Sequence, residues 1–197
     1  MMNLFRPLII GLPLVLAGCS TLSGLSWSSF SPFHWFAESR KVSDQGVGSI
    51  TAATPMTQPA LEKALDGDYR LRGGMETRNG EIVSVYQALA KDQVKLTAYG
   101  PSSGRVAEVV VTDEAIESAW GVKIGTPFSA LDQKAYGACS KGSGEDRDAV
   151  VCQAPQSAHV SYVFKCIWHG PESLMPADDQ LRTWQVSKII WRASAAR

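Results

Sequence analysis

The chain has no excess of positive or negative charge, few histidines and few cysteines. These shortages exclude several classes of function. Its 197 residues carry 19 basic and 19 acidic side chains, so no positive field attracts nucleic acid or anionic lipid. The 3 histidines and 4 cysteines do not have the paired spacing of a zinc site. Nucleophile elbows, Walker loops and His-Glu-x-x-His motifs are also missing. We therefore expect no enzyme, no cofactor, no metal site and no nucleic-acid partner.

Long apolar runs are missing as well. The longest, Leu8 to Leu16, has about nine residues, whereas a membrane-spanning helix needs about 20. It follows Arg6 and ends in Leu16-Ala17-Gly18-Cys19, which resembles the lipobox of bacterial lipoprotein precursors. This pattern predicts a signal peptide over residues 1–18, cleavage before Cys19 and a diacylglyceryl group on the Cys19 thiol.

Lipidation of Cys19 predicts where in the cell the protein is located. One acyl chain anchors only marginally, at about 0.8 kcal/mol per buried CH2, but the two or three chains of a processed lipoprotein, palmitate among them, anchor permanently. Ser20, rather than aspartate, follows the cysteine, which resembles the outer-membrane sorting signal of enterobacterial lipoproteins. We expect a lipid-anchored protein on the periplasmic face of the outer membrane, with the lipid bilayer as its first partner.

Residues 19–42 are expected to form a tether rich in serine and aromatic side chains. Serine favours a flexible linker, but a spacer does not need the five aromatic residues Trp27, Phe30, Phe33, Trp35 and Phe36. These side chains either dock on the domain, lie in the lipid interface or contact a partner protein.

The periplasm is oxidising, so the three remaining cysteines should contain a disulfide. Cys139 and Cys152 flank a polar, glycine-rich loop, and closing it would stabilise the fold by about 3 kcal/mol. We favour this pair, with Cys152–Cys166 as the alternative. Cys166 is otherwise expected as a buried free thiol on the apolar face of its strand.

The hydrophobic pattern favours an α+β fold dominated by antiparallel, sandwich-like sheets, with two short helices. Alternating side chains predict strands over 81–90, 93–99, 104–112, 159–168 and 183–192. One helix is expected from Thr57 to Gly67. A second is expected to be capped by Thr126, to begin at Pro127 and to end at Gly137.

Two halves of the chain resemble each other weakly. Segments 46–55, 60–67 and 106–111 match 121–127, 130–137 and 186–191 in the same order, with offsets of 75, 70 and 80 residues. Two copies at this spacing favour two units that share one core. We therefore expect a single periplasmic domain over residues 43–192, built by duplication from halves at about 45–113 and 120–192, and a tail over 193–197.

Further sequence motifs resemble a known family. They are the lipobox, VSDQGVG at 42–48, LDGDYRLR at 65–72, GVKIGTPF at 121–128, GPESLMP at 170–176 and KIIWR at 188–192. Together they resemble the RpoE-regulated lipoprotein family over nearly the whole chain. The resemblance implies an outer-membrane lipoprotein linked to envelope stress, of uncharacterised activity, and it carries over no site residues.

Three clusters could carry chemistry, but each has a structural explanation. Cys166 with His159 and His169 resembles a nucleophile–base or metal group, although His159 is expected on the other face of the strand. The carboxylates at 66–68 and 145–148 could offer oxygens to calcium, but neither segment has the ligand spacing of an EF-hand. A helix end with a turn and a solvated hairpin tip account for them.

Tryptophans beside the loop 170–180 favour binding over catalysis. We expect Trp168, Leu174, Met175 and Trp184 to form a binding surface, although the same residues could cap the core. The predicted function is a non-enzymatic binding or structural accessory linked to envelope homeostasis, with an envelope protein as a candidate partner. A carrier of a small apolar or lipid-like ligand, held between the halves, is the alternative, and a hydrolase of unknown substrate is the third.

Overall fold

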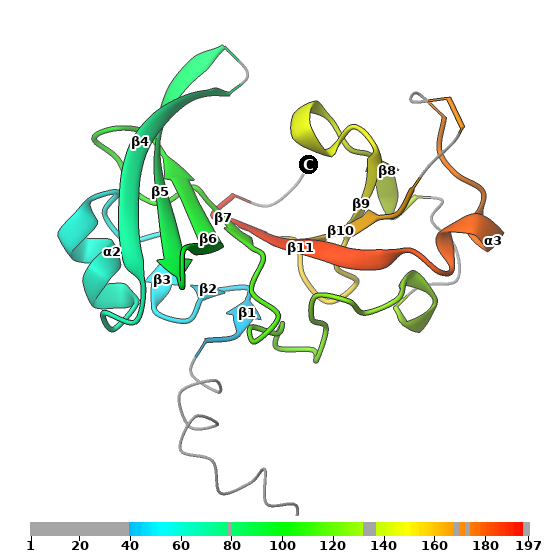
Figure 1. The fold of residues 1–197 in the computed structure, drawn as a ribbon, viewed down its shortest axis with the longest axis horizontal. Helices are drawn as coiled ribbons and strands as arrows, with labels where there is room; N and C mark the ends of the chain where they lie inside the picture. The colour runs from blue at the N-terminus through cyan, green and yellow to red at the C-terminus, as the bar shows by residue number, and fades with distance from the viewer. Residues whose placement is uncertain (1–39, 79, 132–136, 168–169, 172–173, 195–197) are drawn as a thin grey trace, which may run out of the picture.

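The computed structural model describes residues 40–194, except for 79, 132–136, 168–169 and 172–173 (Figure 1). The predicted signal peptide, all but three residues of the tether, and residues 195–197 of the tail lie outside this part. Among the described residues, no helix has the length and apolar composition needed to cross a bilayer.

Most of the domain is one antiparallel sheet of eight strands. Their order across the sheet is β4 (Arg70–Arg78), β5 (Glu81–Ala90), β6 (Gln93–Gly100), β7 (Glu108–Val111), β11 (Gln185–Arg192), β10 (Val160–Lys165), β9 (Ala149–Gln153) and β8 (Cys139–Lys141). A small sheet of β1 (Val42–Ser43), β2 (Gly46–Val47) and β3 (Ile50–Thr51) lies beside it. The predicted fold class, β-dominated with antiparallel sheets and short helices, is confirmed.

The helices agree only in part with the prediction. Helix α2 (Gln58–Ala64) has Thr57 at its N-cap position, although the Thr57 side chain makes no capping hydrogen bond. The second predicted helix begins as a single 3-10 turn, η2 (Phe128–Ala130), which is preceded by Pro127, and residues 132–136 lie outside the described part. The predicted cap was wrong, because the Thr126 hydroxyl instead accepts the backbone N–H of Lys123 at 3.1 Å.

Two further short helices lie in segments that were predicted as loops. Helix α3 (Asp178–Leu181) forms within the 170–180 loop, and Leu181 is its buried residue. A 3-10 turn, η3 (Gly144–Asp146), forms between β8 and β9. Each of these helices makes only about one turn. A single turn is too short to show a hydrophobic period in the sequence.

The large sheet consists of two halves with the same strand order. Strands β4 to β7 form one half of the sheet and β8 to β11 the other, and the halves meet where β7 pairs with β11. One of the four residue pairs of this junction joins Val110 to Ile190. These residues are 80 positions apart, which is the offset of the third sequence match, so equivalent residues face each other at the junction.

The halves also repeat the hydrogen bonds that attach each connecting segment to its strand. In the first half these are Val106 N to Thr54 O at 2.9 Å, Met56 N to Gly104 O at 3.0 Å and Thr51 N to Thr54 Oγ1 at 2.9 Å. In the second they are Val186 N to Thr126 O at 2.9 Å, Phe128 N to Trp184 O at 2.8 Å and Lys123 N to Thr126 Oγ1 at 3.1 Å. Three hydrogen bonds repeated between equivalent positions are what a duplicated unit would retain.

A continuous core covers one face of the large sheet. Trp191, Tyr162 and Phe128 are among its largest fully buried side chains, and the rings of Phe128 and Phe164 meet edge to face at 5.2 Å. The other face of β10 is also buried, because Val163 packs with Ala149 and Ile190. Strand β10 is therefore covered on both faces.

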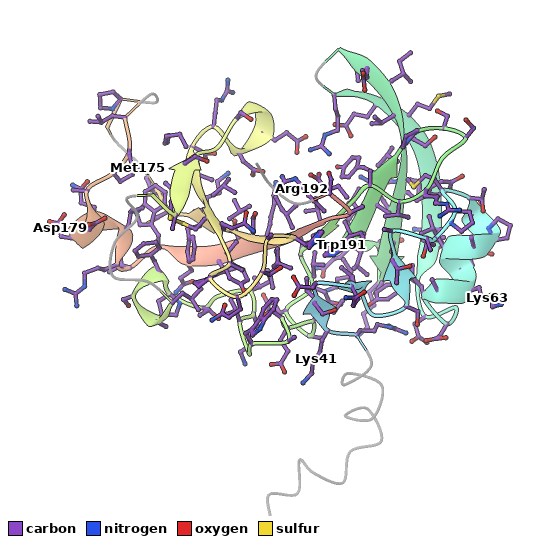
Figure 2. All side chains as sticks on the ribbon, turned by 180° about the vertical axis from the view of Figure 1, so that it is seen from behind. Lys41, Lys63, Met175, Asp179, Trp191 and Arg192 are labelled. Carbon is purple, nitrogen blue, oxygen red and sulfur yellow. A yellow bond between two sulfur atoms is a disulfide. The ribbon has the colours of Figure 1, made fainter. Side chains whose placement is uncertain are left out.

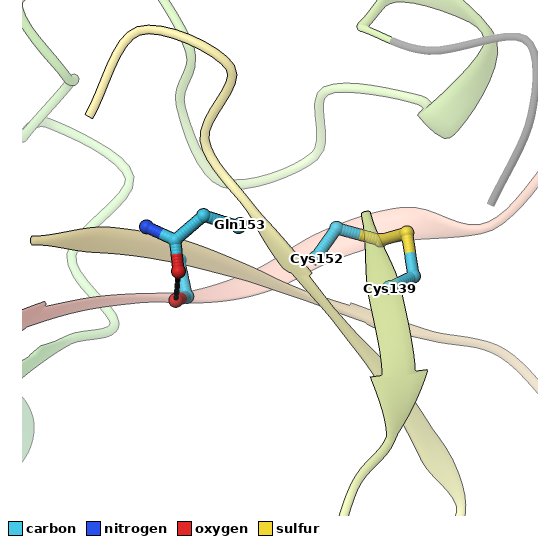
Figure 3. Close-up of a disulfide and its surroundings, with 4 residues drawn as sticks. Cys139, Cys152 and Gln153 are labelled. Atoms are coloured by element: carbon cyan, nitrogen blue, oxygen red, sulfur yellow. Dashed lines mark hydrogen bonds between the residues drawn. A yellow bond between two sulfur atoms is a disulfide. The ribbon is translucent and has the colours of Figure 1, made fainter. Parts of the chain in front are cut away.

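The structure pairs Cys139 with Cys152, as the sequence analysis favoured (Figure 3). The two residues face each other on β8 and β9, so the bridge closes a hairpin. Cys166 is a free thiol, as expected, but its predicted burial was wrong, because the side chain is exposed. Strand β10 ends at Lys165, one residue before Cys166, so the alternation of the strand does not bury this side chain. The alternative Cys152–Cys166 pair is excluded with it.

Candidate functional site

The predicted binding surface does not form as one patch. Trp184 is only 3% exposed and belongs to the core, and Met175 is partly buried against it. Leu174 is exposed, while Trp168 lies outside the described residues. The prediction that Trp184 lies on the surface was therefore wrong. The carbonyl oxygen of Trp184 accepts the backbone N–H of Phe128, which attaches this residue to the buried turn that begins there.

A different site lies where the two halves meet. A hollow of about 750 Å³, here called the crevice, is lined by residues of the β4–β5 hairpin, of the η3 turn and of the junction between β7 and β11. Figure 1 shows the hairpin and the segment between β8 and β9 on either side of that junction. Its lining residues are Glu76, Thr77, Arg78, Glu81, Val83, Tyr99, Gly100, Pro101, Ala107, Glu108, Val110, Ser143, Gly144, Glu145, Asp146, Lys188, Ile190 and Arg192. Val110 and Ile190, which pair with each other across the junction, are both among them, so the crevice lies over the contact between the two halves.

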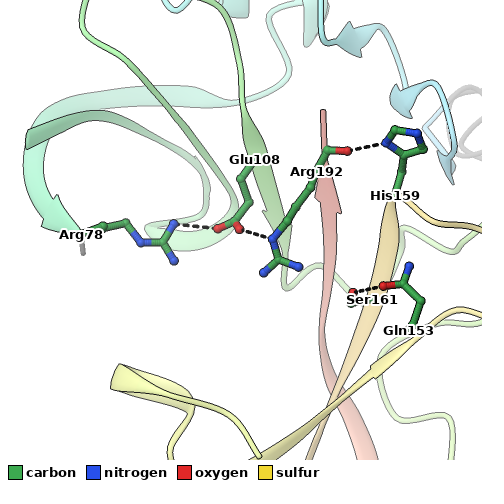
Figure 4. A network of polar contacts seen from close by, with 6 residues as sticks. All are labelled: Arg78, Glu108, Gln153, His159, Ser161 and Arg192. Carbon is green, nitrogen blue, oxygen red and sulfur yellow. Dashed lines mark hydrogen bonds and ion pairs between the residues drawn. The ribbon is translucent and has the colours of Figure 1, made fainter. Parts of the chain in front are cut away.

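One carboxylate in the crevice holds two guanidinium groups (Figure 4). Glu108 Oε1 accepts Nη1 of Arg78 at 2.7 Å, and its Oε2 accepts Nε of Arg192 at 2.8 Å. The Glu108 side chain is only 13% exposed, so it is fixed by both partners. Arg78 comes from β4 and Arg192 from β11, and this cluster therefore ties the outer hairpin of the first half to the second half.

The pKa values of Arg78 and Tyr99 are both raised. Burial lowers the pKa of Arg78, but its hydrogen bond and attraction to Glu108 outweigh burial and raise the pKa above its usual value. The Arg78 guanidinium lies over the Tyr99 ring, 4.2 Å from its centroid. Burial, followed by the charge of Glu76, raises the pKa of Tyr99, so its phenol stays neutral.

The second half adds the ion pair of Lys188 with Asp146 and the carboxylate of Glu145 to the crevice. Lys188 Nζ contacts Asp146 Oδ1 at 2.7 Å, which attaches η3 to β11. Glu76 and Glu81 line the hairpin wall, and Glu145 lines the wall made by η3. The lining holds three cationic and five anionic side chains, so its net charge is negative.

A second hollow contains the residue types of a catalytic triad but not the contacts. It is lined by Asp44, Ser157 and His159, among others. The Ser157 hydroxyl donates to the Asp44 carboxylate and accepts the backbone N–H groups of His159 and Val160 at 3.0 and 3.1 Å. The His159 ring instead contacts the carbonyl oxygen of Arg192 at 2.8 Å. The hydroxyl therefore organises a turn, and the imidazole is not placed to activate it.

The other candidate clusters are accounted for by structural contacts. Asp66 and Asp68 pair with Arg40, and Asp148 pairs with Lys165 at 3.0 Å. His169 lies outside the described residues, and within the described part no group of three or more metal-ligating side chains is present.

Sequence reasoning missed the residues of the crevice. Arg78, Tyr99 and Glu108 stand in no motif, and 84 residues separate Glu108 from Arg192. The one available signal was the duplication, since it directed attention to the space between the halves.

Comparison with known proteins identifies relatives of this chain. The family model described as "Protein of unknown function (DUF1131)" matches residues 24–193. The chain is 49% identical over 191 residues to "Uncharacterized protein YfeY" of Escherichia coli (strain K12), covering 97% of this chain and 100% of that protein. The crystal structure of the uncharacterized protein yfeY from Escherichia coli superposes with a TM-score of 0.71 at 49% identity, covering 77% of this chain and 99% of the other.

Proposed function

The chain belongs to the DUF1131 family, and from this premise we propose that it is a non-enzymatic, lipid-anchored binding protein. Its ligand is a small polar molecule held in the crevice. The observation that carries the proposal is the Arg78–Glu108–Arg192 cluster, which is assembled from both halves inside a hollow of about 750 Å³. That volume is typical of small-molecule sites.

Fixed charges favour binding over catalysis. A catalytic acid or base needs a pKa near the working pH, whereas Arg78 and Tyr99 have pKa values raised further above it. Such groups donate hydrogen bonds without exchanging protons. A hydrolase is therefore the weaker proposal.

The lining also favours a polar ligand over an apolar one. Eight of the lining side chains are charged, and an apolar ligand would remove water from them without replacing its hydrogen bonds. Only a few lining residues, such as Val83, Val110 and Ile190, offer apolar contact. The carrier of a lipid-like molecule is the second candidate, and it would use these three residues.

The arrangement suits an anchored protein. The described chain begins at Arg40 and Lys41, next to β1, on the side of the domain away from the tip of the β4–β5 hairpin (Figures 1 and 2). With Cys19 in the periplasmic leaflet of the outer membrane, the crevice would face away from the lipid. The anchor rests on the lipobox, and the link to the envelope stress response rests on the resemblance to RpoE-regulated lipoproteins.

Photo-crosslinking in intact cells tests the crevice. A photoreactive residue at Val83, which lines the crevice, should gain a small-molecule adduct. The same residue at its neighbour Ile82, which is 67% exposed and points to the opposite face of β5, should not. Equal labelling at both positions, or no adduct at Val83, would reject the proposal.

The anchor has an independent test. Replacing Cys19 with alanine should abolish incorporation of radioactive palmitate, because no thiol remains to accept the diacylglyceryl group. Labelling that persists in the Cys19→Ala chain would show that the lipobox is not used.

A further inference from the structure

We infer that the crevice recognises a zwitterion, whose anionic oxygen group is held by Arg78 and Arg192 and whose ammonium group is held by carboxylates of the crevice walls. This inference rests on the proposed function and specifies the chemistry of its ligand. It is carried by two sets of opposite charges that line one hollow.

The first set is the guanidinium pair. A guanidinium has five N–H donors, yet Arg78 gives only Nη1 to Glu108 and Arg192 only Nε. The two terminal nitrogens of Arg192 point away from Glu108 (Figure 4). Two arginines and one glutamate leave one positive charge, which a single carboxylate or phosphate group neutralises.

Glu108 also prepares the pair for binding. Because its buried carboxylate already holds both side chains, little rotamer freedom remains to be lost when an anion arrives. A forked guanidinium suits the two oxygens of a carboxylate or phosphate, and such charge-assisted hydrogen bonds are among the strongest in proteins.

The second set is the acidic walls. Glu76 and Glu81 on the hairpin and Glu145 on η3 line the crevice, and they form no salt bridge with other residues that the structure describes. The charges of Glu76 and Glu145 both reach Tyr99, where they add to the effect of burial in raising its pKa. A plain anion would be repelled by these walls, whereas a molecule that also carries an ammonium group is attracted by them.

Two sources share this chemistry. The unblocked ends of a short peptide provide a carboxylate and an ammonium group, and the phosphoethanolamine headgroup of a lipid provides a phosphate and an ammonium group. Both present the charges close together, as the dimensions of one hollow require.

Calorimetric titration of the purified full chain distinguishes these sources. We expect binding of trialanine, of O-phosphoethanolamine or of both, and the result names the source. N-acetyl-trialanine, trialanine amide and inorganic phosphate should each bind at least tenfold more weakly than the zwitterion that binds.

Equal affinity for a zwitterion and for the analogues that lack one of its charged ends would overturn the inference. Failure of both zwitterions to bind would overturn it too. If Val83 still gains an adduct in cells in that case, the crevice remains a binding site and only the ligand chemistry is wrong.

Substitutions paired with matched controls test which residues bind the anionic end of the ligand and which bind its ammonium end. Arg192→Gln should weaken binding of the zwitterion on the order of tenfold, because a charge-assisted hydrogen bond is lost. Arg72→Gln is the control, since the exposed Arg72 lies on the same hairpin but bonds to Gln87 outside the crevice. Glu145→Gln should weaken binding of the zwitterion more than Glu62→Gln, which changes an exposed residue of α2.

A second arginine variant guards against misfolding. Arg78→Gln changes the other guanidinium and, because Arg78 lies on an outer strand, leaves the core strand β11 untouched. Unchanged affinity in both folded arginine variants would overturn the assignment of the anionic end.

Discussion

The outer strand pairs of the two halves occupy equivalent places in the sheet but are held together in different ways. In the first half Gly73 of β4 faces Tyr86 of β5, and in the second half Cys139 of β8 faces Cys152 of β9. Each cysteine follows its counterpart by 66 residues. One hairpin is held by an aromatic ring over a glycine, and the other by a covalent bond.

The difference follows the lengths of the strands. Strands β4 and β5 pair over nine residues, so their ladder of hydrogen bonds holds the hairpin. The Tyr86 ring covers Gly73, since a Cβ atom there would lie 2.9 Å from Tyr86 Cε1, which is aromatic rescue of a strand glycine. Strands β8 and β9 pair over only three residues, and the disulfide compensates for the short ladder.

This contrast bears on the crevice. The long hairpin of the first half reaches beyond the sheet and supplies Arg78 and the acidic wall, whereas the short hairpin of the second half supplies the compact η3 wall. The two halves have the same strand order, and their unequal hairpins make the hollow at the junction asymmetric.

Substitutions at equivalent core positions should have unequal costs. Trp191 is 1% exposed and donates its indole N–H to the carbonyl of Asp44 at 3.1 Å, so Trp191→Ala should reduce the free energy of unfolding by about 4 kcal/mol. Its counterpart is Val111, and Val111→Ala removes far fewer atoms and should cost roughly half as much. Urea denaturation measures both values. Equal losses would show that the halves share their stability evenly.

Removing the disulfide should cost slightly less. The Cys139→Ser, Cys152→Ser double variant releases a loop of 13 residues, and its free energy of unfolding should fall by about 3 kcal/mol. Urea denaturation under non-reducing conditions measures the loss. A loss below about 1 kcal/mol would mean that the three-residue ladder of β8 and β9 is sufficient by itself.

The reciprocal variant tests the equivalence of the two pairs. Gly73→Cys with Tyr86→Cys, in a Cys166→Ser background, should form a second disulfide, because the new cysteines occupy the register of Cys139 and Cys152. Mass spectrometry after thiol alkylation counts the free thiols. Two alkylated cysteines would contradict the equivalence.

Sequence reasoning succeeded where local patterns decide the structure. Alternation predicted β5, β6 and β11 within two residues of their observed bounds, because each has one face on the core. The polar, glycine-rich loop predicted the hairpin that pairs Cys139 with Cys152. Strand β4 was missed, since Gly73, Gly74 and its many charged residues hide the alternation of an exposed edge strand.

The remaining errors involve contacts between distant parts of the chain. Alternation placed Cys166 on a buried face, but the strand ends one residue earlier and exposes it. The partner of Glu108 across the junction is fixed by the pairing of β7 with β11, which no local pattern contains. Strand pairing, rather than strand propensity, therefore decides where the candidate site lies.

Charge replacement should have a smaller effect that differs between the halves. Glu108 and its counterpart Lys188 have opposite charges, and Glu108 alone bridges the halves. Glu108→Gln should reduce the free energy of unfolding by about 1 kcal/mol, because both arginines are more than a third exposed and solvent screens them. Lys188→Gln should cost less. Urea denaturation at low and high salt measures both, and a Glu108→Gln loss that is insensitive to salt would contradict the ionic explanation.

The pKa values of Tyr99 and Tyr162 are both raised, but the causes differ. Burial is the larger cause in both, but Glu76 adds to it at Tyr99, whereas the Ser118 hydrogen bond opposes it at Tyr162. Glu76→Gln should therefore lower the pKa of Tyr99 slightly and leave that of Tyr162 unchanged, as measured by NMR titration of the ring carbons. Equal shifts would indicate a general change of structure.

The same raised pKa values predict how stability depends on pH. Above a pH of about 10 the unfolded chain releases tyrosine protons that the folded chain keeps, so the free energy of unfolding should fall as the pH rises toward the folded-state values. Tyr99→Phe removes one such group from the first half and Tyr162→Phe one from the second. Each variant should flatten the alkaline decline of stability. Glu76→Gln should flatten it only where Tyr99 is present, because the charge of Glu76 acts on Tyr99 and not on Tyr162.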